Sequence, residues 1–89
     1  MIIGEVRTFP NVKPNKEQVT KILEEAAEVY SAWEKWSPSE SKTPMFRECA
    51  DIIMAVSNFC AALGMSDMRA YIDECEKIQE FRGRYAIQK

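Results

Sequence analysis

Histidine is absent from this sequence of 89 residues. Its absence excludes the Ser-His-Asp and Cys-His mechanisms of nucleophilic catalysis, because both use an imidazole as the general base. It also excludes HExxH zinc sites and the di-iron sites of helical bundles that use Glu-x-x-His ligands. Any chemistry that this chain performs must therefore use carboxylates, lysine, arginine, tyrosine or a thiol.

Cysteine is scarce, and the three that occur are Cys49, Cys60 and Cys75. An odd number, the lack of a CxxC pair and positions inside apolar helical patterns argue against a disulfide framework and against a zinc site. We therefore expect three reduced thiols that are buried as small apolar groups.

Long hydrophobic runs and a strong excess of one charge are also missing. No apolar stretch reaches the length of a transmembrane span, and the N-terminal residues MIIGEVRTFP lack the apolar core of a signal peptide. We therefore expect a cytoplasmic protein that does not use a membrane as a partner. The net charge is -2 and the basic residues are scattered, which gives no electrostatic reason to expect a nucleic acid polymer as a partner.

Proline and glycine are few, and they separate segments in which apolar residues recur at helical spacing. Asn15 is a suitable N-cap for the first helix, and Ser66 or Asp67 for the third, while Gly64 and Gly83 end the second and third. The sequence therefore predicts an all-α chain with one domain over residues 1–89. Its parts are an N-terminal arm and three helices, at residues 1–14, about 16–36, 45–63 and 67–81.

The short length of the chain predicts association between copies. Three helices of this size bury a limited fraction of their surface, so they are marginally stable alone. We expect the three-helix chain to form an oligomeric helical bundle.

The predicted second helix is apolar almost all the way round, yet it contains Glu48 and Asp51. Carboxylates in an apolar helix are costly to desolvate unless a cation compensates them. The first helix carries a second acidic group, formed by Glu24, Glu25 and Glu28. Two pairs spaced i, i+3 that face each other across a bundle would supply the oxygen ligands that Mg²⁺ or Mn²⁺ prefers. This spacing predicts a metal site.

The sequence is also compatible with two other interpretations of the acids. The acids of the first helix are also compatible with an ordinary solvated face, near the positive end of the helix dipole. Those of the second helix are compatible with ion pairs inside an oligomer. The basic residues considered for these ion pairs are Arg47, Arg69, Arg82 and Arg84.

The acidic pairs also resemble a family signature. Glu25-Ala-Ala-Glu28, followed after 19 residues by Glu48-Cys-Ala-Asp51, resembles the ExxE…ExxD motif of the MazG-like all-α nucleoside triphosphate pyrophosphohydrolases. The residues around both motifs, including Asn58-Phe59 and Leu63-Gly64, are similar to those of short, phage-type members. The resemblance extends over residues 16–85.

This resemblance implies hydrolysis of a nucleoside or deoxynucleoside triphosphate to the monophosphate and pyrophosphate, with Mg²⁺ required and Mn²⁺ as a possible substitute. It implies a homodimer or homotetramer. Glu25, Glu28, Glu48 and Asp51 would be the metal ligands, and Glu24 or Glu25 would accept the proton of the attacking water.

The resemblance also suggests residues for the substrate. Lys77, Arg82 and Arg84 would contact the phosphates, although the asparagine that family members often carry among these cations is absent. Asn58 would bind the base or sugar, or else a protein group. Trp33 or Trp36 would stack on the base, although a tryptophan at helical spacing is more often part of a core. The alternative from a different class is a non-catalytic helical interaction module, in which the acids form structural ion pairs.

Overall fold

The chain folds into three helices: α1 (Lys16–Lys35), α2 (Thr43–Ala62) and α3 (Arg69–Phe81). The computed structural model describes residues 1 and 5–86, and these contain no strand, so the all-α class is confirmed. Parts of the predicted N-terminal arm and of the C-terminal end, at residues 2–4 and 87–89, lie outside the described residues. Within residues 5–14 the predicted arm contains neither helix nor strand.

The helix ends lie close to the positions that the capping residues predict. Asn15 caps α1 by accepting a hydrogen bond from the backbone N–H of Gln18, at 3.2 Å. The N-cap of α3 is Met68, and neither predicted cap residue occupies that position. Asp67, one residue earlier, accepts a hydrogen bond from the N–H of Arg69 at 2.8 Å. Helix α2 begins at Thr43, slightly before the predicted start, because Pro44 is favourable in the first turn, where a missing N–H costs nothing.

Gly64 ends α2 in a Schellman motif. Its φ angle is +93°, its N–H donates to the carbonyl of Ala61, and the N–H of Met65 donates to that of Cys60. Gly83 ends α3 in the same way, with a φ angle of +73°. Positive φ angles favour glycine, which has no Cβ, so both helix ends follow directly from the sequence.

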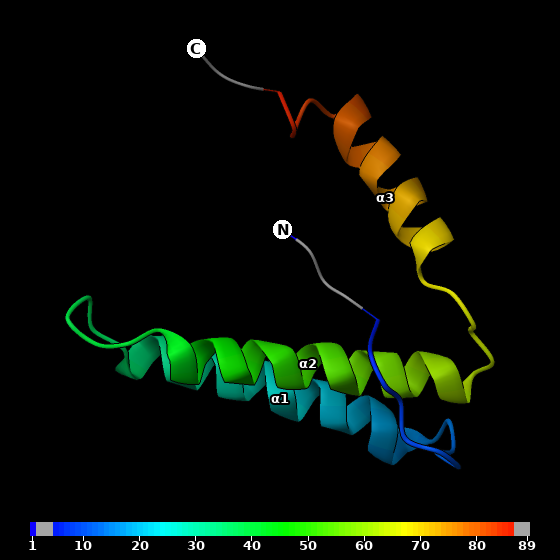
Figure 1. Ribbon diagram of the computed structural model, residues 1–89, viewed down its shortest axis with the longest axis horizontal. Coiled ribbons are helices and arrows are strands. Elements are labelled where there is room, and N and C mark those ends of the chain that lie inside the picture. Colours follow the sequence, from blue (N-terminus) through cyan, green and yellow to red (C-terminus); the bar gives the residue numbers. More distant parts are fainter. Residues whose placement is uncertain (2–4, 87–89) are drawn as a thin grey trace.

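Helices α1 and α2 form an antiparallel hairpin and lie side by side along most of their length (Figure 1). The buried and half-buried residues of α1 recur every three or four positions and face α2, which is typical of a packed helix. They include Gln18, Ile22, Glu25, Val29 and Ala32, and the C-cap residue Trp36 is also half-buried. A carboxylate therefore occupies a central position in the helix–helix interface.

Helix α3 stands away from the hairpin (Figure 1). No Cα atom of α3 lies within 8 Å of a Cα atom of α1 or α2. Within the described residues Ala55 is the one buried apolar residue, and no large side chain is fully buried. Many large apolar side chains are instead exposed, including Leu23 at 69% and Tyr30 at 62%. One copy of the chain therefore has only a thin core.

The expectation of buried cysteines is wrong for the single chain. Cys49 and Cys75 are exposed and Cys60 is half-buried, although all three are free thiols as predicted. The reason is that the faces of α2 and α3 that carry them have no other helix of the same chain packed against them.

Among the described residues, no helix has both the length and the apolar character that crossing a bilayer requires.

The positive φ angle of Gly64 leads to a stability prediction. Gly64→Ala should lower the free energy of unfolding by about 1 kcal/mol, because alanine is strained in the left-handed region. No heavy atom lies within 4 Å of an added Cβ, so the loss should come from the backbone alone. Gly64→Asn is the matched control and should lose less, since asparagine tolerates this region better. Urea unfolding at fixed protein concentration measures both variants, and equal losses would contradict this explanation.

Candidate metal centre

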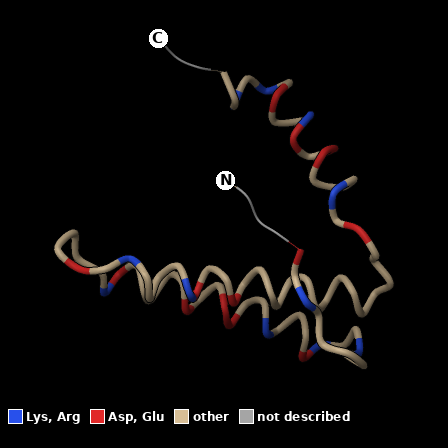
Figure 2. Tube along the Cα trace, viewed as in Figure 1, with Lys and Arg blue, Asp and Glu red and all other residues tan. Residues whose placement is uncertain are grey.

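Four carboxylates meet in the middle of the α1–α2 hairpin. Glu25 and Glu28 lie one turn apart on α1, and Glu48 and Asp51 lie one turn apart on α2. One carboxylate oxygen from each residue lies within 4.8 Å of those from the other three. Figure 2 shows acidic positions of both helices gathered midway along the hairpin. The structure thus brings together the four residues that the sequence proposes as metal ligands.

Two oxygens of this cluster are buried without a partner. Glu25 is 5% exposed, and Glu48 is half-buried. Among the described residues, no donor hydrogen-bonds to Oε2 of Glu25 or to Oε2 of Glu48. A buried acceptor that is left unpaired costs free energy, and a charged one costs more. These two oxygens could therefore accept a cation as their partner.

Lys21 is the cation that contacts the cluster. Its Nζ atom lies 2.8 Å from Oε1 of Glu25, which is four residues later on α1. The hydrogen bond to Lys21 lowers the pKa of Glu25, against the opposing effect of burial, and the same hydrogen bond raises the pKa of Lys21. Sequence reasoning missed this pair, although the i, i+4 spacing of Lys21 and Glu25 is a recognisable signal.

Arg69 of α3, which is one of the arginines proposed as ion-pair partners, does not pair with the four carboxylates in the single chain. Arg69 forms ion pairs with Asp73 at 2.8 Å and with Glu76 at 3.0 Å. Both partners lie on α3 itself, which does not contact the hairpin.

Glu28 and Glu48 share the remaining part of the cluster. The pKa of Glu28 is raised, chiefly by the close approach of the Glu48 carboxylate and next by the negative charge of Glu25. Raised values of this kind arise when neighbouring carboxylates cannot all be ionised without repulsion. The oxygen-only donor set is the kind that Mg²⁺ and Mn²⁺ prefer, with water completing the shell. A divalent cation would relieve the repulsion that protonation of Glu28 otherwise relieves.

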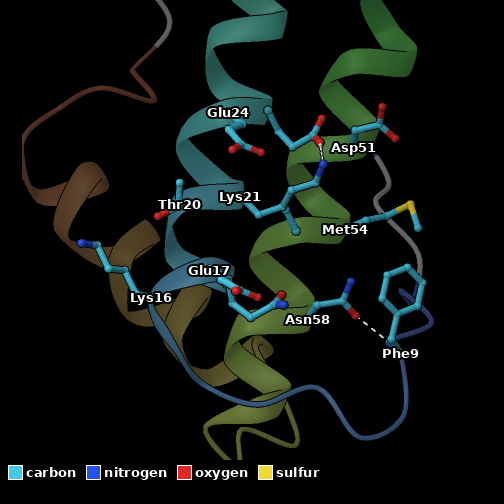
Figure 3. A pocket seen from close by; sticks show the side chains of 12 residues that line it. Phe9, Lys16, Glu17, Thr20, Lys21, Glu24, Asp51, Met54 and Asn58 are labelled. Atoms are coloured by element: carbon cyan, nitrogen blue, oxygen red, sulfur yellow. Dashed lines mark hydrogen bonds and ion pairs between the residues drawn. The ribbon is translucent and has the colours of Figure 1, made fainter.

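An open groove of about 910 Å³ begins at this cluster. Glu24, Glu25 and Asp51 line one part of it, and Phe9 and Asn58 line another. Figure 3 shows these elements around the groove, with the arm crossing beside α2. The groove is wide enough for a ligand that reaches the carboxylates from solvent.

Asn58 connects the N-terminal arm to the hairpin. It is 5% exposed, and its Oδ1 accepts a hydrogen bond of 2.8 Å from the backbone N–H of Phe9 (Figure 3). The carbonyl oxygen of Asn58 thus has a protein partner, which is one of the two partners considered from the sequence. Phe9 and Met54, which also line the groove, had no signal in the sequence.

The other proposed substrate residues lie elsewhere in the single chain. Lys77 is on α3, and Arg82 and Arg84 follow in the turn at its end. The separation of α3 from the hairpin keeps Lys77 away from the carboxylates. Trp33 is 58% exposed and does not line the groove. It lies about 80° around α1 from Glu25, so it is at the border of the interface with α2.

Comparisons with models of protein families, with curated proteins and with solved structures each gave no match.

The contact between Glu28 and Glu48 leads to a prediction on metal-free stability. Glu28→Gln should raise the melting temperature at neutral pH, because glutamine can hydrogen-bond Glu48 without adding a negative charge. The wild-type chain has a raised Glu28 pKa, so it gains stability from protonated Glu28 at low pH and loses it as the pH rises through that pKa. The advantage of the variant should therefore grow with pH.

Thermal melting in EDTA between about pH 4.5 and about pH 7.5 measures this difference. Glu34→Gln, which changes an exposed acid on the same helix, is the control and should show no such trend. A Glu28→Gln variant that is less stable than wild type at neutral pH would indicate that Glu28 serves a structural ion pair.

Proposed function

We propose that the chain is a Mg²⁺-dependent nucleoside triphosphate pyrophosphohydrolase of the MazG-like kind. It would convert a nucleoside or deoxynucleoside triphosphate to the monophosphate and pyrophosphate, as nucleotide-pool house-cleaning. The observation that supports this proposal best is the four-carboxylate cluster with two unpaired buried oxygens beside an open groove. The spacing of the two acidic pairs, which resembles the family motif, supports it independently.

The residues of the cluster have distinct roles in this proposal. Glu25, Glu28, Glu48 and Asp51 hold the metal. A bound Mg²⁺ supplies charge neutralisation of the triphosphate and lowers the pKa of a bound water. Mn²⁺ accepts the same oxygen ligands and is the natural substitute.

Glu24 is the better of the two candidates for general base. It is exposed, and it lines the groove beside the cluster. Glu25 is engaged by Lys21 and would be further engaged as a metal ligand, so its lone pairs are less available to a proton. Glu24 would take the proton of the water that attacks the α-phosphorus, and pyrophosphate would leave.

The substrate site is completed, in our proposal, by a second copy of the chain. An apolar stripe runs along the side of α1 that does not face α2, with the spacing of a packed helix. Its members are Val19, Leu23, Ala26, Tyr30 and Trp33, and all five are exposed in the single chain. A homodimer or homotetramer that buries this stripe also offers a route to bring Lys77, Arg82 and Arg84 of one copy to the groove of another. Trp33 then stacks on a nucleotide only if the groove is shared between copies.

A non-catalytic interaction module is the second candidate. It is favoured by the ion pair between Lys21 and Glu25 and by the large exposed apolar surface. In this reading the acids serve stability rather than metal binding, and the groove has no substrate.

Metal binding separates the two candidates. Mg²⁺ or Mn²⁺ at a hundred times its dissociation constant should stabilise the enzyme by about 2.7 kcal/mol, because it binds only the folded state. Differential scanning fluorimetry at rising metal concentration measures the shift. Glu48→Gln should abolish it, whereas Glu34→Gln should leave it unchanged. An equal response in wild type and Glu48→Gln would place the metal elsewhere.

Activity gives the direct test. Common and modified deoxynucleoside and nucleoside triphosphates, assayed one by one, should include a substrate from which the wild-type chain releases pyrophosphate. Glu48→Ala and Asp51→Ala should each reduce the rate by at least about 100-fold, since both remove a ligand. Activity that survives both substitutions would rule out the proposed site.

A further inference from the structure

The ion pair at the edge of the cluster has an unusual asymmetry. The carboxylate of Glu25 uses Oε1 to bind Lys21, while its Oε2 is buried and has no donor among the described residues. The side chain of Glu25 is 7% exposed, whereas that of Lys21 is 54% exposed. One partner is therefore held in the helix interface, and the other reaches it from the groove (Figure 3).

A divalent cation on the four carboxylates would compete with Lys21. The ligand oxygens lie within 4.8 Å of one another, and Nζ of Lys21 lies 2.8 Å from one oxygen of Glu25. The ammonium group would then be only a few ångströms from the metal, where like charges repel strongly. Lys21 is able to move away, because its stem is flexible and its ammonium group is a small, mobile charge.

The side chain of Lys21 lines the groove, so it has space to move into when it leaves Glu25. Lys16 and Lys21 are the two cations among the residues that line it, and Lys21 is the one in contact with the cluster. The cations of α3 are absent from this lining in the single chain. A phosphate group that binds beside the carboxylates would therefore have Lys21 as its nearest cation of the groove, and an ammonium group binds phosphate through charge-assisted hydrogen bonds.

We propose that Lys21 is an exchangeable counter-ion: it neutralises Glu25 without metal, and with metal bound it turns into the groove and binds a phosphate of the substrate. This inference rests on the proposed function, and it assigns a phosphate-binding residue to the same chain that carries the carboxylates. Lys21 also protects the metal-free fold, because it compensates a carboxylate that is buried between two helices.

The variant Lys21→Met tests the competition, because it keeps an apolar stem and removes the charge. Its Mn²⁺ affinity, measured by calorimetry without nucleotide, should be about tenfold tighter than that of wild type, a size typical of groups next to a metal ligand. Its melting temperature in EDTA should fall. Lys16→Met, which removes the other cation of the groove, is the matched control and should change neither quantity.

Lysine labelling tests the movement. Acetylation of Lys21 by a limiting reagent, followed by mass spectrometry, should be slow in EDTA and several-fold faster in Mn²⁺, because the freed amine is more reactive. Addition of pyrophosphate as the phosphate probe should slow it again. Lys35, an exposed residue at the end of α1, is the internal reference and should react at a constant rate.

The outcomes separate this inference from the proposed function. The exchange would be overturned if wild type and Lys21→Met bound Mn²⁺ with equal affinity, or if the metal did not change the labelling rate of Lys21. Either result would leave the proposed metal site intact. Exchange without hydrolysis of any nucleotide would overturn the proposed function alone. Binding of Mn²⁺ to Lys21→Met but not to wild type would also overturn the exchange, because Lys21 would then block the site instead of giving way to the metal. Absence of binding to both would overturn both proposals.

Discussion

The rest of the structure depends on the carboxylate of Glu25, which is buried between α1 and α2 where most helix pairs have an apolar side chain. A charge in this position is tolerated only with compensation, because the interface does not solvate it as water does. Lys21 compensates one oxygen of Glu25, and the other oxygen remains unpaired. The hairpin is therefore stabilised by any further positive charge that binds at this position. Glu28, Glu48 and Asp51 add further negative charge from both helices.

The buried polar residues leave the hairpin with little apolar packing between its helices. Polar residues, Glu25 and Asn58, occupy buried positions of the hairpin, and Ala55 is the one buried apolar residue in the described chain. Much of the apolar surface lies instead on the outer side of α1 and on α3. Burial of this surface against another copy would supply the stability that the polar interface does not, in keeping with the small size of the chain.

The same arrangement separates the two halves of the proposed site. The carboxylates and the groove belong to the hairpin, whereas three of the proposed phosphate contacts belong to α3 and to the turn that follows it. Lys21 lies between these two parts, because it contacts a proposed metal ligand and also lines the groove. A site assembled from the hairpin of one copy and α3 of another would couple catalysis to association.

Local features were predictable from the sequence because they depend on neighbours along the chain. The caps at Asn15, Gly64 and Gly83 and the periodicity of the helices follow from backbone chemistry within one or two turns. The i, i+3 spacing likewise placed each acidic pair on one helix face. The prediction that the cysteines are buried was wrong, because the burial of a residue depends on which other helix packs against its face.

The sequence by itself determined the helices, their ends and the two acidic pairs, since each depends on the geometry of a single helix. Only the tertiary structure decided that these pairs meet, that Glu25 is buried with one oxygen unpaired, and that α3 stands apart from the hairpin. It also decided that Lys21, rather than an arginine, pairs with the cluster, and that Asn58 holds the N-terminal arm. The physical reason is that the pairing of helices depends on the free energy of burying whole helix faces. The spacing of apolar residues in a sequence shows which face of a helix is apolar, but it does not show which other helix packs against that face.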